Sequence, residues 1–144
     1  MAGAVSAALT ATRIELSING QPLAVFAELK GITSALELPA FIPAPSETRF
    51  ELTTGRQLPP CITLKRRLTP SIELAAWHEL AILGAPGAAR RSCALTMHNA
   101  KGEAVARYNL TDAWPSKIEI GALDSGILTE TVTLTCKLLQ RVSV

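Results

Sequence analysis

His78 and Glu79 begin the pattern H-E-x-x-H, in which two histidines one helical turn apart bind zinc and the glutamate acts as general base. Ile82 stands where the second histidine is needed, so the zinc-protease pattern is incomplete. His98 is isolated beside an expected turn, where a surface or hydrogen-bonded role is the simpler interpretation. The sequence therefore predicts no catalytic, metal-binding or cofactor-binding residues, and no cofactor.

Other residue types with chemical potential are scattered along the chain. Asp112 and Asp124 have no local partner for acid–base catalysis, and there is no G-x-S-x-G motif and no phosphate-binding P-loop. The three cysteines, Cys61, Cys93 and Cys136, are widely spaced and odd in number. Such spacing favours buried free thiols in a reducing compartment over disulfides or a zinc site. We therefore expect a protein that is not an enzyme.

Composition allows a single aliphatic core. The chain has 144 residues, of which 48% are hydrophobic and only 4% aromatic. Its net charge of +2 comes from interspersed charges, which gives no footprint for specific nucleic-acid recognition. The one run of basic residues near a strand is Lys65-Arg66-Arg67. Lys65 and Arg67 share one face of the expected strand and Arg66 lies on the other, so the run does not form one basic patch. The N-terminus lacks the basic region of a signal peptide, and no stretch has the roughly 18 apolar residues of a membrane span.

Period-two alternation predicts mostly β-structure. Ile14, Leu16 and Ile18 alternate with polar residues, and Asn19-Gly20 then marks a hairpin whose return strand is expected over Leu23–Leu29, before Gly31 breaks the pattern. A further strand is expected over Cys61–Leu68. Between them, residues 36–60 hold five prolines and are expected to form an extended loop, with a short strand around Phe50 and Leu52.

Helical spacing replaces the strand pattern over residues 70–83. Thr69 is the expected N-cap and Gly84 the expected stop, followed by a loop over residues 84–89. Ile72, Ala76, Leu80 and Leu83 form an apolar stripe that is expected to face the core. Trp77 flanks this stripe and is interpreted as a core side chain rather than a ligand platform.

Four strands are expected after the helix. Cys93, Leu95 and Met97 alternate in the first, and Asn99–Gly102 turns into the second, Glu103–Leu110. The third contains Ile118 and Ile120, after a turn that Trp114-Pro115 is expected to fix, with Trp114 partly buried. The fourth is expected to run over Leu128–Leu138, with threonines alternating on its polar face. The fold class is therefore mostly β (α+β): an antiparallel β-barrel or sandwich with one α-helix.

Three segments together resemble the tail tube protein family of contractile phages, bacteriocins and extracellular contractile injection systems. "ITLKRRLTPSIELAAWHE" is similar to the family's strand–helix segment, which contains the equivalent of Trp77. "ALTMHNAKGEAVARYNLTDAWPSKIEI" resembles its next hairpin, in which Ala-Trp-Pro-x-Lys, here with Trp114, Pro115 and Lys117, is the most specific element. "ILTETVTLTCKLL" looks like its last strand. The family also resembles in fold the haemolysin-coregulated tube protein of type VI secretion.

This resemblance implies one tail-tube-like domain over residues 1–144, with an N-terminal arm over 1–12. It implies stacked hexameric rings that form the inner tube of a contractile injection machine and carry payload or DNA. The implied partners are further copies of the chain, a sheath protein, and baseplate or tube-initiator and cap proteins. Assembly is expected in the bacterial cytoplasm, within a virion or a phage-tail-like particle that can be released.

The Pro-rich segment departs from the family, whose long loop is usually Gly-rich and contacts the next ring. Residues Glu47, Arg49, Glu51 and Arg56 are the expected inter-ring contacts. Two alternatives stay open: a specialised tube paralogue, such as a baseplate-proximal ring or terminal cap, and a small β-barrel module that binds a ligand or cargo.

Overall fold

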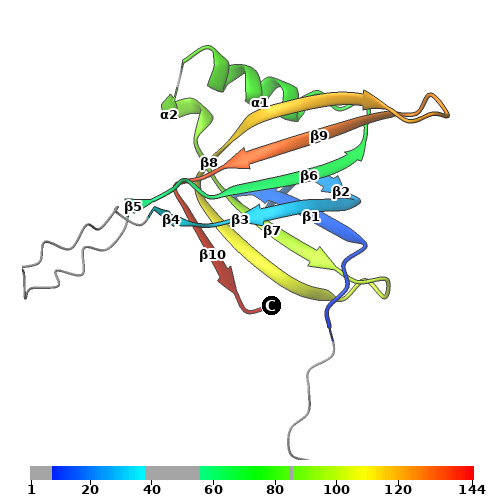
Figure 1. Ribbon diagram of the computed structural model, residues 1–144, viewed down its shortest axis with the longest axis horizontal. Coiled ribbons are helices and arrows are strands. Elements are labelled where there is room, and N and C mark those ends of the chain that lie inside the picture. The colour runs from blue at the N-terminus through cyan, green and yellow to red at the C-terminus, as the bar shows by residue number, and fades with distance from the viewer. Residues whose placement is uncertain (1–7, 38–55, 85) are drawn as a thin grey trace, which may run out of the picture.

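The computed structural model describes residues 8–37, 56–84 and 86–144, which form strands and two helices (Figure 1). In chain order, the elements are β1 (Arg13–Ile18), β2 (Gln21–Phe26), β3 (Glu28–Thr33), β4 (Leu36–Glu37), β5 (Arg56–Gln57), β6 (Cys61–Arg67), α1 (Glu73–Ile82), α2 (Pro86–Ala89), β7 (Arg91–His98), β8 (Ala104–Ala122), β9 (Leu128–Thr135) and β10 (Leu138–Val142). The expected mostly-β antiparallel fold with one substantial helix is confirmed.

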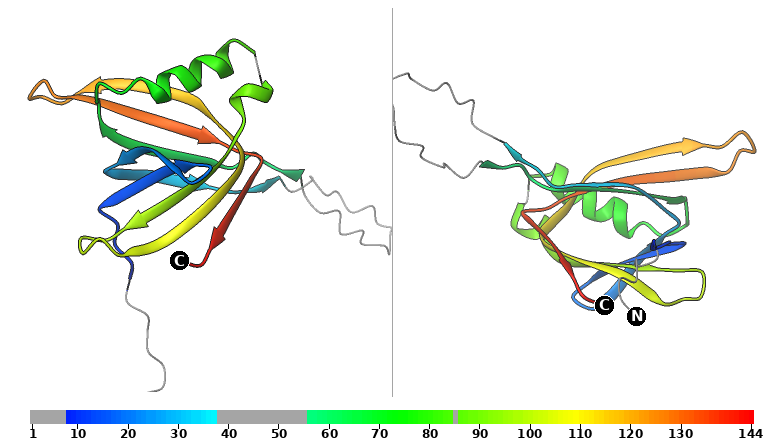
Figure 2. Two further views of the ribbon diagram at one scale, coloured as in Figure 1. Left: turned by 180° about the vertical axis from the view of Figure 1, so that it is seen from behind. Right: turned by 60° about the horizontal axis from the view of Figure 1, so that its bottom comes forward.

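Strand β8 belongs to two layers of one bent, open sheet (Figure 2). Its first half pairs with β7 and β10, and its second half pairs with β9. Layer A is thus β2-β1-β7-β8-β10, and layer B is β8-β9-β6-β3. Each of these ladders is antiparallel. The architecture is therefore a sandwich whose two layers are joined by a single 19-residue strand.

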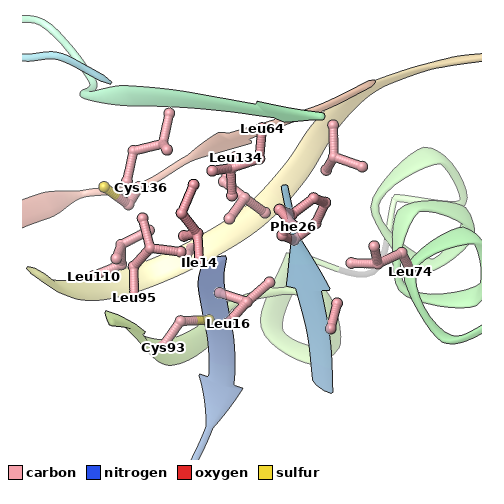
Figure 3. Packing of buried hydrophobic residues seen from close by; sticks show 14 of the residues in the cluster. Ile14, Leu16, Phe26, Leu64, Leu74, Cys93, Leu95, Leu110, Leu134 and Cys136 are labelled. Carbon is pink, nitrogen blue, oxygen red and sulfur yellow. The ribbon is translucent and has the colours of Figure 1, made fainter. Parts of the chain in front are cut away.

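Aliphatic side chains from both layers fill the space between them (Figure 3). Leu16 and Leu95 come from layer A, and Leu64 and Leu134 from layer B, and all four have no exposed surface. Because side chains alternate along a strand, each strand contributes every second residue. Burying one such leucine stabilises the fold by about 1.5–3 kcal/mol. The core is therefore filled mainly by aliphatic side chains, in agreement with the small number of aromatic residues in the sequence.

The first hairpin forms as predicted, and the chain then changes layer earlier than predicted. Asn19 and Gly20 have φ angles of 51° and 81°, the left-handed pair that a two-residue turn between twisted strands requires. The expected single strand Leu23–Leu29 is wrong, because β2 ends at Phe26 and the chain enters layer B as β3. Gly31 lies inside β3, at an irregularity in its pairing with β6.

The C-terminal strand is also divided between the layers. A single strand over Leu128–Leu138 was expected, but β9 ends at Thr135. The backbone N–H of Lys137 then donates to the carbonyl of Thr111, 2.9 Å away, and β10 pairs with β8 in layer A. Alternating residues continue smoothly through this corner, so the sequence pattern alone does not reveal it.

Helix α1 begins and faces differently from the sequence prediction. It starts at Glu73, preceded by Ile72 without a side-chain cap, so Thr69 is not the N-cap. Its buried residues are Leu74 and Trp77. The predicted apolar stripe faces outward instead, since Ile72 and Leu83 are 73% and 75% exposed. The helix ends at Ile82, and Gly84 follows just beyond it with a φ of 75°, in agreement with its expected role as the stop. A four-residue helix, α2, then forms where a loop was predicted.

The Pro-rich segment is described only at its ends. Leu36 and Glu37 pair with Gln57 and Arg56 as the two-stranded sheet β4–β5. The expected short strand around Phe50 and Leu52 lies outside the described residues. The two ends of the segment are therefore held side by side at one end of the fold.

Candidate assembly surfaces

The outer face of layer B is a wall of hydroxyl and charged groups. Its centre is the column Thr131, Thr133 and Thr135 on β9, as the alternation predicted. Thr133 Oγ1 lies 3.3 Å from Thr63 Oγ1 on β6, and Thr135 Oγ1 donates to Ser116 Oγ at 2.7 Å. These contacts pair hydroxyls across three strands. The wall is thus hydrophilic while keeping residues of high strand propensity.

Apolar side chains are exposed at other places on the surface. At the two ends of α1 these are the cap residues Ile72 and Leu83 and the last helical residue Ile82, between 67% and 75% exposed. On the β8–β9 hairpin they are Ile120, Leu123, Ile127 and Leu128, between 37% and 55% exposed. A helix that is apolar on both faces is normally covered on both. These two regions are therefore candidate contact surfaces with other chains.

Trp77 is a core residue. Only 1% of it is exposed, and its indole N–H donates to the carbonyl of Ala89. The guanidinium carbon of Arg91 lies 5.4 Å from the ring centroid. The residue therefore joins α1, α2 and the start of β7. This placement agrees with its interpretation as a packing residue.

The pair Trp114-Pro115 does not form a turn, contrary to the sequence prediction. Both residues lie inside β8, opposite Thr135 and Leu134 of β9. Pro115 is tolerated because the other edge of this part of β8 faces α1, where its carbonyl lies 2.7 Å from Nδ1 of His78. Trp114 is half-buried, as expected.

The remaining residues of the expected site are exposed or lie outside the described part of the chain. Lys117 is on β8 and forms an ion pair with Glu119 at 2.7 Å, where both side chains are largely exposed. Glu47, Arg49 and Glu51 fall outside the described residues. Arg56 is in β5, and only its backbone is described. The inter-ring role of these four loop residues stays a prediction.

A buried ion pair closes one end of the core, and the sequence analysis did not identify it. Nε of Arg66 donates to Oε1 of Glu130 at 2.8 Å, with side chains 8% and 5% exposed. The Arg66 guanidinium also lies over the Phe26 ring, 5.4 Å from its centroid. A signal existed in the sequence: Arg66 and Glu130 each interrupt the inward-facing apolar phase of a strand. Their strands pair so that the two residues face each other.

The thiols are free, and two of the three are buried. Burial raises the pKa of Cys93 to about 12 and that of Cys136 to about 11. Cys61 is only half-buried, which corrects the expectation that all three are enclosed. Because thiolate is the reactive form, the two buried thiols are protected both sterically and by protonation.

Native protein treated with iodoacetamide at pH 8 should therefore be modified first at Cys61. Cys93 and Cys136 should react at the rate of unfolding, with peptide mass spectrometry as the readout. The raised pKa values of Cys93 and Cys136 also imply that stability is retained below about pH 9 and falls between about pH 9 and 12, because only the unfolded state releases these protons there. Equal modification of all three thiols in folded protein would contradict this placement.

Within residues 8–37, 56–84 and 86–144, no three His, Cys, Asp or Glu side chains are grouped to hold a metal ion. Neither helix in that part of the chain has the length and hydropathy to span a membrane.

Residues 10–140 match the family model described as T4-like virus tail tube protein gp19. The chain belongs to this tail tube family. Solved structures agree with the family's fold. A chain in the extended sheath/tube terminator of PVC, an extracellular contractile injection system, superposes with a TM-score of 0.72 at 17% identity, covering 97% of this chain and 100% of that one.

Two further structures place the tail tube fold in a wider group. A chain of the extended PVC sheath–tube complex has a TM-score of 0.68 at 18% identity, covering 97% of this chain and 95% of that one. Hcp1 from Flavobacterium johnsoniae has a TM-score of 0.54 at 16% identity, covering 89% and 93%. A comparison with curated proteins found no match. The resemblance to tail tube proteins and to the type VI tube protein is thus confirmed at the level of family and fold.

Proposed function

We propose that this chain is a structural subunit of the inner tube of a contractile phage-tail-like injection machine, in which six copies form a ring and the rings stack. The observation that carries the proposal is the tail tube family match over residues 10–140. The exposed apolar residues of α1 and of the β8–β9 hairpin support it, because they need partners that a monomer lacks.

The assembled tube would serve as a conduit for payload or DNA and needs no catalytic step. Its partners would be further copies of itself, a sheath, a baseplate initiator and a cap, with assembly in the bacterial cytoplasm and incorporation into a virion or released particle. Among the described strands, β2, β3 and β10 lie at edges of the open sheet, and these edges would pair with neighbouring copies. The Pro-rich arm anchored at β4–β5 would contact the adjacent ring.

Purified protein should form rings or tubes as its concentration rises. The expected result is a transition from monomer to large particles in light scattering, with rings of uniform diameter in negative-stain electron microscopy. Rings without stacking would favour a specialised terminal ring. A strict monomer at every concentration and salt would contradict the tube function and favour a binding module.

A further inference from the structure

The turn between β8 and β9 presents apolar side chains and a carboxylate to solvent. We call residues 123–127 the tip. Leu123 N–H donates to Ile127 O and Gly126 N–H to Leu123 O, both at 2.8 Å, and Gly126 adopts a φ of 86°, so the tip has a defined shape. Leu123 and Ile127 are 44% and 37% exposed, and Asp124 between them is exposed. The tip therefore has the composition of a contact and not of a solvated turn.

A small hollow with complementary chemistry lies at the α2 end of layer B. It measures about 190 Å³ and is lined by Ala81, Ala89, Arg90 and Trp114. The two alanines leave room for a side chain, and the Arg90 guanidinium lies over the Trp114 ring, 5.2 Å from its centroid. Among the described residues, no carboxylate is within ion-pair distance of Arg90. Tryptophan and arginine are the side chains most enriched at interface hot spots.

The tip and the hollow lie at opposite ends of the subunit. Figures 1 and 2 show the β8–β9 turn projecting beyond the body at one end and α2 at the other. Trp114, in the hollow, and Ala122, beside the tip, are eight residues apart on β8, which corresponds to about 26 Å of extended strand. A subunit therefore cannot place its own tip in its own hollow, whereas a second copy can.

We propose that the tip of one copy docks into the hollow of the next. The Asp124 carboxylate accepts hydrogen bonds from the Arg90 guanidinium, while Leu123 and Ile127 cover Trp114 and the exposed apolar end of α1. The contact joins two different surfaces, so it repeats head to tail and generates a ring or filament. The charge pair fixes register, and the apolar groups supply buried area. This inference rests on the proposed self-assembly and names the residues that carry it.

Two charge reversals test the contact. Asp124→Arg leaves every copy with arginine at both surfaces, and Arg90→Asp leaves every copy with aspartate at both. Each variant alone should assemble at least about tenfold more weakly than the wild type, because like charges then face each other. An equimolar mixture should recover assembly, because alternating copies restore opposite charges at each contact. Sedimentation velocity and light scattering measure both effects.

Matched controls separate this contact from general effects of charge. Lys101→Glu reverses a charge on the exposed β7–β8 turn and should assemble like the wild type. Thermal melts show whether each variant is folded. Asp124 lies on an exposed turn, so Asp124→Arg keeps the test decisive if Arg90→Asp lowers stability.

Two results would overturn the inference while leaving the tube function intact: wild-type assembly by either single variant, or failure of two folded variants to recover on mixing. A wild-type protein that never assembles would reject the proposed function and this inference with it.

Discussion

Replacing Trp77 with alanine is expected to lower the free energy of unfolding by about 3–5 kcal/mol, because the side chain is fully enclosed and a large cavity would remain. The substitution also leaves the Ala89 carbonyl without its indole donor and removes the ring beneath Arg91. The melting temperature should fall by about 10–17 °C in a domain of this size. Chemical denaturation of the unassembled subunit measures the change.

The second tryptophan provides the matched control. Trp114 is half-buried in the isolated subunit, so Trp114→Ala should cost much less stability than Trp77→Ala. It should instead weaken self-association, since Trp114 lines the proposed docking hollow. If Trp77→Ala lowered the free energy of unfolding as little as Trp114→Ala, Trp77 would not be holding α1 to the core.

The second large effect is expected at the buried ion pair. Glu130→Leu leaves the Arg66 guanidinium enclosed without a counter-charge and should destabilise the subunit by about 3–5 kcal/mol. Arg66→Met should cost a similar amount by leaving Glu130 unpaired. The double variant removes both charges, and similar buried pairs have been replaced by apolar residues at no cost or with a gain of about 1–4 kcal/mol.

Urea denaturation of the four proteins forms a double-mutant cycle. The exposed pair Lys117–Glu119 is the control, because its double replacement by methionine and leucine should leave the urea midpoint unchanged. If the Arg66–Glu130 double variant is as unstable as either single variant, the apolar surroundings and Phe26 do not accommodate replacement side chains, and the pair is required for packing.

Local backbone preferences explain what could be predicted from the sequence. Asn19-Gly20 specifies its turn because both residues tolerate positive φ, and the alternation around Leu95 and Leu134 specifies which side chains are buried. Gly84 ends α1 for a similarly local reason. These features depend on a few neighbouring residues, so a single sequence is enough to locate them.

The errors arise where tertiary contacts override local signals. Pro115 indicated a turn because proline has no backbone N–H to donate to a neighbouring strand. In the fold, the edge of β8 at which that N–H is missing faces α1 and not another strand. The stripe Ile72, Ala76 and Leu83 indicated a buried face, but an apolar pattern does not say whether the same chain or another chain covers it. The docking hollow was not predicted, because Ala81, Ala89 and Trp114 meet only after α1 packs beside β8.

The division of β8 between both layers also sets the order in which the subunit can be completed during synthesis. Strands β8, β9 and β10 follow all the other described elements in chain order, from Ala104 onward. A nascent chain that ends before β8 can form β1–β2 and other early pairs but cannot join the two layers. Pairing between distant segments is slow, and it must wait here for the residues from Ala104 onward to leave the ribosome. Because the tip follows β8 along the chain, a subunit can present the tip to another copy only after the strand that joins its two layers has been made.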